Sequence, residues 1–135
     1  LIKKLIKADI SVKSAKVVIL GFTFKENCPD TRNTRVIDIV NELREYGIEP
    51  IISDPQADPL ETKQEYDLHL AEISEITDAD AIVLAVPHKE YESLSFNDLS
   101  KFYKDVSNKN RVLIDVKGLL DRKEYEDAGY NYWRL

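Results

Sequence analysis

Short apolar runs alternate with polar segments along this chain, and five of the runs are typical of strands. Each is four to six residues long, and most are rich in Val, Ile and Leu, as expected of strands covered on both faces. The predicted strands are residues 17–20, 48–52, 81–86, 111–116 and 130–135. The segments between them show the longer spacing of helices.

The clearest helix pattern has Val36, Ile39, Val40 and Leu43 at 3.6-residue spacing, followed by Gly47 where a glycine commonly ends a helix. The other predicted helices are residues 71–79, 95–107 and 119–128, while residues 56–70 are polar and irregular. Strands that alternate with helices predict an α/β class: a three-layer, Rossmann-like domain with a parallel sheet of about five to six strands.

Residues 1–14 form an amphipathic pattern ahead of this domain, with lysines between the apolar positions. We expect them to be the end of a long helix that connects to a preceding domain, and residues 15–135 to be the domain itself. A native amphipathic helix at the N-terminus explains the same pattern equally well, so both interpretations are open.

Composition limits the class of protein. A chain of 135 residues that is 43% hydrophobic can form a domain with its own core, without disulfides or metal. The net charge of −6 argues against general binding to nucleic acid, and neither a membrane span nor a signal peptide is apparent. The single cysteine offers no disulfide framework and no zinc-type pair, so we expect no metal site and a reducing, cytoplasmic location.

The polar loop after the first predicted strand is the main candidate for a binding site. Gly21 ends the apolar run, and Lys25, Asp30 and Arg32 follow it. Ligands bind beyond the carboxyl ends of parallel strands, and both cations suit an anion at the start of a helix. No further glycine occurs before Gly47, so the G-x-G-x-x-G pattern of a usual dinucleotide site is missing. From these residues alone, an anionic ligand and a solvated surface loop are both open.

The segment GFTFKENCPDTRNTRV resembles the start of the C-terminal domain of the UDP-glucose/GDP-mannose dehydrogenase family. The family pattern is a glycine after the first strand, Phe-Lys, a short polar spacer, and Asp-x-Arg opening a helix. Gly21, Phe24, Lys25, Asp30 and Arg32 match it. The wording FKENCPDTRNT is most similar to the branch that oxidises UDP-N-acetylhexosamines for bacterial surface polysaccharides, and the resemblance extends over nearly the whole chain from residue 16 onward.

The resemblance implies one part of a three-part enzyme. In this family an N-terminal Rossmann domain binds NAD, a helical middle domain carries the catalytic cysteine, and a C-terminal domain closes over the nucleotide sugar. The chain would be that third part, with the other two domains of the same polypeptide as its partners. The complete protein would be an NAD-dependent 6-dehydrogenase of a UDP-N-acetylhexosamine and a homodimer or larger, whereas this chain alone would be inactive.

The resemblance also implies roles for three cations. Lys25 would contact the UDP-sugar, and Arg32 would reach NAD held by the absent domain, unless Arg32 merely pairs with Asp30 and stabilises the loop. Lys117 stands where some members place an arginine on the substrate, a change that keeps the charge but loses the bidentate geometry. No catalytic residue is expected in this chain.

Three further residues invite a functional role, but for each we favour a structural one. Cys28 has neither a histidine nor a Gly-rich segment beside it, so we interpret it as structural or incidental rather than as a nucleophile. His88 could contact a ligand or relay a proton, but a hydrogen-bonded histidine that caps the following loop is favoured. Asp54 could bind a ribose, but the Asp-Pro pair is also an ordinary turn, which is favoured.

A stand-alone binding or regulatory module of flavodoxin-like shape is the competing hypothesis. A receiver domain would carry clustered acids at the end of its first strand, and residues 21–23 have none. A G-x-G-x-x-G domain upstream in the complete gene would favour the dehydrogenase. Because each follows a predicted strand, Gly21, Asp54, His88 and Lys117 are expected at one edge of the sheet.

Overall fold

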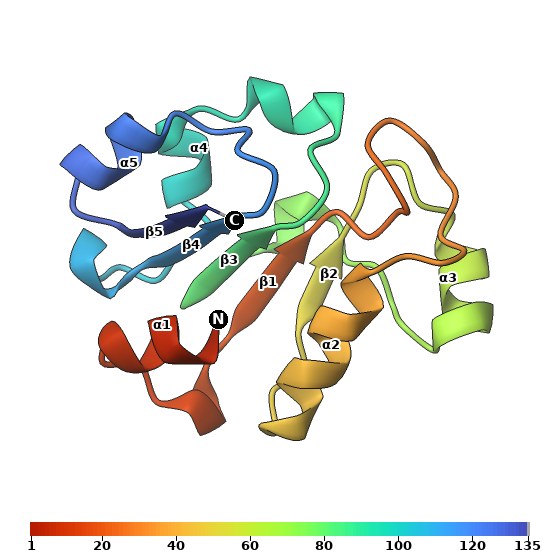
Figure 1. Cartoon of the computed structure of the whole chain (residues 1–135), viewed down its shortest axis with the longest axis horizontal. Helices are drawn as coiled ribbons and strands as arrows, with labels where there is room; N and C mark the ends of the chain where they lie inside the picture. The colour runs from red at the N-terminus through yellow and green to blue at the C-terminus, as the bar shows by residue number, and fades with distance from the viewer. Residues whose placement is uncertain (135) are drawn as a thin grey trace.

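The computed structural model of the chain describes residues 1–134 and is built around a five-stranded, wholly parallel sheet. The strand order is β2-β1-β3-β4-β5 (Figure 1). The strands are β1 (Val17–Leu20), β2 (Ile51–Ser53), β3 (Ala81–Leu84), β4 (Val112–Asp115) and β5 (Asn131–Arg134). The predicted α/β, Rossmann-like class is confirmed, and Leu135, the last residue of the predicted fifth strand, lies outside the described residues.

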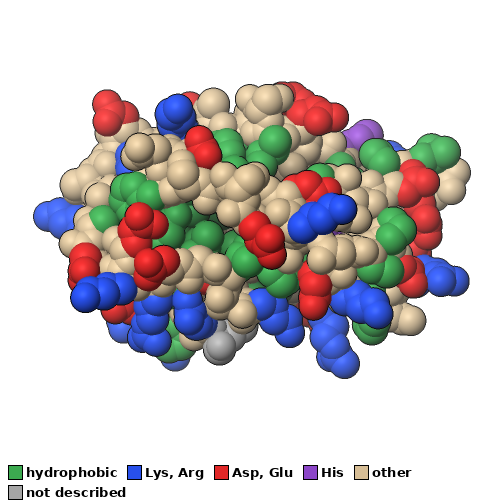
Figure 2. Space-filling model, turned by 90° about the horizontal axis from the view of Figure 1, so that it is seen from above, with side chains coloured by type: hydrophobic (Ala, Val, Ile, Leu, Met, Phe, Trp, Pro, Cys, Tyr) green, Lys and Arg blue, Asp and Glu red, His purple; other side chains and the backbone are tan. Residues whose placement is uncertain are grey.

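All carboxyl ends of these strands meet at one edge of the sheet, because every pair of neighbours is parallel. Gly21, Asp54, His88 and Lys117 follow β1, β2, β3 and β4, so the prediction that they share this edge is confirmed. The strand arrows rise towards the top of Figure 1, and Figure 2 therefore looks down on this edge. Basic and acidic side chains are interspersed there, with hydrophobic side chains exposed between them (Figure 2).

Helices cover both faces of the sheet and produce three layers (Figure 1). On one face lie α1 (Ile2–Lys7) and α2 (Val36–Glu45); on the other lie α4 (Phe96–Ser100) and α5 (Arg122–Asp127). A further helix, α3 (Pro59–Tyr66), lies beside β2, and single 3₁₀ turns occur at Val12–Ser14, Ile73–Glu75, Lys89–Ser93 and Asn108–Asn110.

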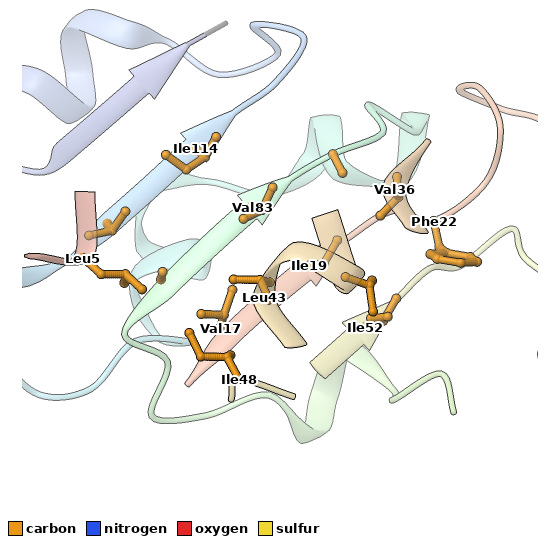
Figure 3. Packing of buried hydrophobic residues seen from close by; sticks show 14 of the residues in the cluster. Leu5, Val17, Ile19, Phe22, Val36, Leu43, Ile48, Ile52, Val83 and Ile114 are labelled. Carbon is orange, nitrogen blue, oxygen red and sulfur yellow. The ribbon is translucent and has the colours of Figure 1, made fainter. Parts of the chain in front are cut away.

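The two cores arise from the alternation of side chains along each strand. In β1, Val17 and Ile19 join the core under α1 and α2, whereas Val18 and Leu20 join the core under α4 and α5. Figure 3 shows the first core, where Leu5 of α1 contributes to the same cluster as the β-strand residues. The α1 helix ends at Lys7, and the assignment of residues 1–14 to an inter-domain connection stays a prediction.

Several element boundaries differ from those predicted. Residues 56–70 contain α3, which hydrophobic spacing could not reveal because Thr62 is its only buried residue. This helix is instead fixed locally, since Asp58 accepts hydrogen bonds from the N–H groups of Leu60 and Glu61. The predicted helix at 71–79 is wrong, because only one 3₁₀ turn forms there, and the helix predicted at 95–107 ends at Ser100.

Candidate functional site

The polar loop after β1, here the β1 loop (residues 21–35), begins at a glycine that the neighbouring chain leaves no room to replace. Gly21 has a φ of +97°, and a Cβ there would lie 2.7 Å from Val86 Cβ and 2.8 Å from Val86 N. Its N–H also donates a hydrogen bond to Ser53 O at 2.8 Å. The β1 loop therefore starts in close contact with the chain segments that follow β2 and β3.

Asp54 and His88 form a buried ion-pair-like contact beneath this loop. Both side chains are fully buried, and His88 Nε2 lies 2.9 Å from Asp54 Oδ2. The same carboxylate oxygen accepts hydrogen bonds from the backbone N–H groups of Phe22 at 2.5 Å and Thr23 at 3.1 Å. Asp54, which follows β2, thus binds the start of the β1 loop, and His88, which follows β3, binds Asp54.

The surroundings of Asp54 keep its carboxylate charged. Burial alone raises its pKa, but hydrogen bonds from His88 and from the backbone N–H groups of Phe22 and Gln56 outweigh burial, and the pKa is lowered. Oδ1 accepts from the N–H groups of Gln56 at 2.7 Å and Ala57 at 3.0 Å, which confirms the predicted Asp-Pro turn. Both oxygens are thus occupied by the protein, which leaves no role for Asp54 as a ribose ligand.

The hydrogen bonds of His88 define its tautomer. Nδ1 accepts from the backbone N–H of Asn27 at 3.0 Å, so the proton resides on Nε2, which donates to Asp54. The prediction that His88 is hydrogen-bonded is confirmed. The prediction that it caps the following loop is wrong, because the partners of its side chain are Asp54 and the β1 loop. With both nitrogens occupied and no exposed surface, His88 does not contact a ligand.

The β1 loop presents Lys25 and Phe24 to solvent. Its backbone is tied down on both sides of these residues, because Thr23 Oγ1 donates to Lys25 O at 2.9 Å and Phe24 N–H donates to Asp30 O at 2.7 Å. Phe24 is 53% exposed. An exposed aromatic ring beside a lysine offers a stacking surface for a base next to a cation for phosphate. The sequence pattern included Phe24, but only the structure shows that its ring is free for contact.

Arg32 makes a forked ion pair with Asp30. Nε and Nη2 of Arg32 donate to Asp30 Oδ1 and Oδ2 at 3.0 and 3.2 Å, and the arginine side chain is 72% exposed. The hydrogen bond from Arg32 lowers the pKa of Asp30, and Asp30 in turn raises the pKa of Arg32. Within residues 1–134, Nη1 of Arg32 makes no hydrogen bond, so the guanidinium keeps donors for an anion.

A second loop at this edge, here the β4 loop (residues 116–121), presents Lys117. Asp115 is fully buried at the end of β4, and its carboxylate accepts hydrogen bonds from the N–H groups of Gly118, Leu119 and Leu120 at 2.9–3.1 Å. Lys117 is exposed on this turn. Because β3 lies between β1 and β4, Lys25 and Lys117 project from loops two strands apart at the same edge.

An apolar cavity of about 360 Å³ opens at the β2 side of the same edge. Its walls include Pro59, Leu70, Ile73, Tyr91 and Leu94. Neither Lys25 nor Lys117 lines it, so the cavity and the cationic loops are separate features.

Cys28 is a half-buried, free thiol. His88 binds the residue before it, Asn27, a proximity that the sequence did not reveal, but neither ring nitrogen is free to act as a base. Within residues 1–134, no group of three or more His, Cys, Asp or Glu side chains is placed to hold a metal ion. No helix in this part of the chain is long and apolar enough to cross a membrane.

Residues 18–122 match the UDP binding domain of the UDP-glucose/GDP-mannose dehydrogenase family. The chain belongs to this family. It is 43% identical over 126 residues to the UDP-N-acetyl-D-glucosamine 6-dehydrogenase of Salmonella typhi, a match that covers 92% of this chain and 28% of that protein. It is 40% identical over 134 residues to Protein CapL of Staphylococcus aureus, covering 99% of this chain and 30% of that protein. The family predicted from the β1 loop is confirmed.

Solved structures agree on the fold. The chain superposes on the NDP-N-acetyl-D-galactosaminuronic acid dehydrogenase of Methanosarcina mazei with a TM-score of 0.84 and 22% identity, over 98% of this chain and 27% of that one. At this identity the likeness supports the fold alone. The chain spans 30% or less of the length of these relatives, so their names describe much larger proteins.

Proposed function

We propose that this chain is the nucleotide-sugar-binding domain of an NAD-dependent dehydrogenase that oxidises C6 of a UDP-N-acetylhexosamine to the uronic acid. The match to a UDP binding domain over residues 18–122 is the observation that carries the proposal. The name of the Salmonella typhi relative, a UDP-N-acetyl-D-glucosamine 6-dehydrogenase, supports the reaction and the substrate class.

The β1 and β4 loops each present a lysine that suits the nucleotide sugar. Lys25 and Lys117 are exposed cations on loops whose backbones are held in place by buried aspartates. Because these backbones are already ordered, an anion that binds the lysines loses little free energy to ordering the loops. We assign both lysines to the UDP-sugar. The exposed ring of Phe24 beside Lys25 suits the nucleotide base or sugar face.

We assign Arg32 to the cofactor. NAD, when bound, accepts the hydride from C6. The β1 loop lacks the glycine pattern of a dinucleotide site, so the main NAD site would belong to another domain of a longer polypeptide. Arg32 fits a phosphate presented from across a cleft, because Asp30 holds one side of its guanidinium and Nη1 keeps free donors.

The contribution of this chain would be to bind and orient the nucleotide sugar and to exclude water on closure, rather than to make or break bonds. Within residues 1–134, Cys28 makes no hydrogen bond to a basic side chain, and both nitrogens of the buried His88 are already occupied. The thiol that the two successive oxidations require would therefore come from another domain.

Calorimetric titration with UDP tests the binding role. UDP is expected to bind the chain more tightly than uridine, because the lysines recognise the diphosphate, and Lys25→Ala is expected to weaken binding. Lys109→Ala is the matched control, since Lys109 is also exposed but precedes β4 and lies at the opposite edge of the sheet. Equal losses in both variants, or no preference for UDP over uridine, would contradict the assignment.

The catalytic role needs the longer polypeptide. A protein that carries this chain behind a G-x-G-x-x-G domain is expected to form two NADH per UDP-N-acetylhexosamine, whereas this chain alone forms none. NADH production by this chain alone, persisting after repurification, would overturn the proposal.

A further inference from the structure

A chain of hydrogen bonds leads from the buried Asp54–His88 pair to both sides of Lys25. On the N-terminal side, Asp54 Oδ2 holds the N–H of Thr23, and Thr23 Oγ1 donates to Lys25 O at 2.9 Å. On the C-terminal side, His88 Nδ1 accepts from the N–H of Asn27 at 3.0 Å. The backbone of Lys25 is thus anchored two residues before and two residues after its own position.

Asn27 is held from the segment that follows β3. Its φ is +58°, a left-handed conformation that asparagine adopts more readily than most residues with a side chain. His88 Nδ1 accepts from its N–H, and its own Oδ1 accepts from the N–H of Lys89 at 2.8 Å. The segment after β3 therefore sets the direction in which the β1 loop leaves Lys25.

We propose that His88, oriented by Asp54, is a positioning residue that holds Lys25 where it meets the diphosphate of the nucleotide sugar. This inference rests on the proposed function of Lys25. His88 acts through the backbone of Asn27 and not by contact, since its side chain is fully buried and both ring nitrogens are occupied by the protein.

The two nitrogens of His88 bind different partners, so a substitution can keep one contact and remove the other. The effect of positioning on UDP affinity can therefore be distinguished from a general loss of stability. Nε2 donates to Asp54 and lies 3.1 Å from Thr23 Oγ1, so its partners are buried, whereas Nδ1 accepts from the backbone of Asn27 on the exposed part of the β1 loop. In His88→Asn the amide oxygen can take the place of Nδ1 and keep Asn27. In His88→Gln the longer amide reaches the place of Nε2 and keeps Asp54, but leaves Asn27 without an acceptor.

The experiment compares these two variants by calorimetry with UDP and by hydrogen exchange of the Asn27 amide. His88→Gln is expected to speed exchange at Asn27 and to weaken UDP binding by roughly three- to tenfold, the effect of losing one hydrogen bond. His88→Asn is expected to bind UDP within about twofold of the wild type, even if it unfolds at a lower temperature. His69→Gln and His69→Asn are the controls, because His69 is exposed.

Asn27→Gly provides a second test that does not disturb the core. Glycine tolerates the positive φ, and the substitution removes only the contact with Lys89 from an exposed residue. UDP binding is expected to weaken about two- to threefold, in the same direction as in His88→Gln.

The outcomes separate this inference from the proposed function. Equal weakening of UDP binding in His88→Gln and His88→Asn would overturn the positioning role, because the loss of affinity would then not depend on the hydrogen bond to Asn27. Unchanged UDP binding in His88→Gln, together with weakened binding in Lys25→Ala, would overturn the positioning role and leave the UDP site standing. Unchanged binding in Lys25→Ala would overturn the UDP assignment itself, and the positioning role with it.

Discussion

The β1 and β4 loops each present one lysine at the same edge of the sheet, and each is held by a buried aspartate, yet the two aspartates act over different ranges. Asp115 binds the N–H groups of residues 118–120, so it shapes its own turn. Asp54 shapes its own turn through Oδ1 and, through Oδ2, also holds Phe22, which lies 32 residues earlier in the chain.

This difference shows how loop length determines what must support a site. The short β4 loop is defined by one carboxylate, with further contacts from β5, where Tyr132 Oη donates to Asp115 at 2.6 Å. The longer β1 loop has hydrogen bonds of its own but also depends on residues that follow two other strands. Substitutions far from the β1 loop in sequence should therefore disturb Lys25, whereas Lys117 should respond mainly to its own neighbours.

Removal of each aspartate should have the largest effect and should show the difference most clearly. Asp54→Ala leaves the Nε2–H of His88 and several buried N–H groups without an acceptor, and because each such group costs about 1–3 kcal/mol, the free energy of unfolding is expected to fall by about 3–5 kcal/mol. Asp115→Ala is expected to lower it by only about 1–3 kcal/mol, because the N–H groups and the Tyr132 hydroxyl that it frees are partly exposed and can bind water. Urea denaturation at pH 7 measures both, and equal losses would contradict the comparison.

The glycines that begin or shape the two loops offer a second matched pair. Gly21→Ala places a Cβ against backbone atoms of Val86 at a φ of +97°, and is expected to destabilise by about 2–5 kcal/mol. In Gly118→Ala the nearest atom is Arg134 Nε at 3.1 Å, the end of a flexible side chain, so a loss of about 1–2 kcal/mol from the positive φ is expected. Thermal melts of the two variants should differ accordingly, and a larger shift for Gly118→Ala would contradict this account.

The sequence predicted the features that depend on local pattern and missed those that depend on contacts between distant segments. The apolar runs predicted the parallel sheet, and Gly21 and Lys25 were recognised from the β1 loop itself. The pairing of Asp54 with His88 could not be predicted, because 34 residues separate them and each has an ordinary local explanation. Only the sheet order, which brings the ends of β1, β2 and β3 together, reveals what they do.

The same reasoning explains the errors in the helices. The α3 helix buries only Thr62, so its sequence carries no hydrophobic period, although Asp58 and Pro59 are recognisable start signals. Residues 71–79 have apolar positions at plausible spacing, but these side chains pack as a connection between β2 and β3 with one 3₁₀ turn. Tertiary packing, rather than propensity, decides both cases.

Replacement of the two lysines is the third test of the comparison and concerns ligand affinity. Lys25→Ala is expected to weaken UDP binding by roughly ten- to a hundredfold, the effect of one charge-assisted hydrogen bond. Lys117→Ala is expected to weaken it less, and Lys117→Arg should bind at least as tightly as the wild type, because a fork restores bidentate geometry on phosphate. Calorimetry with UDP gives all three values; a loss of affinity in Lys117→Arg would remove Lys117 from the assigned site.

The pH dependence of stability should reveal the charged state of Asp54. Its pKa is lowered in the folded protein, so its stabilising contribution is complete above the unfolded value near 3.9 and is lost as the pH falls through the lower folded value. In Asp54→Asn this contribution is missing at every pH. The difference in unfolding free energy between wild type and Asp54→Asn is therefore expected to be constant near neutrality and to shrink below about pH 4. A difference that widens on acidification would contradict the lowered pKa.

Arg32 provides the last and smallest test, because its ion pair with Asp30 is exposed and should add little to stability. In the longer dehydrogenase that we propose, Arg32→Ala is expected to raise KM for NAD by roughly three- to tenfold and to change KM for the UDP-sugar less. Arg32→Lys should recover only part of this loss, since a point charge does not reproduce the fork. If Arg32 serves only to hold the β1 loop through Asp30, Arg32→Ala and Asp30→Asn should instead raise both KM values equally and lower the melting temperature of this chain by the same amount. That result would place Arg32 with the residues that support Lys25 rather than with those that bind the cofactor.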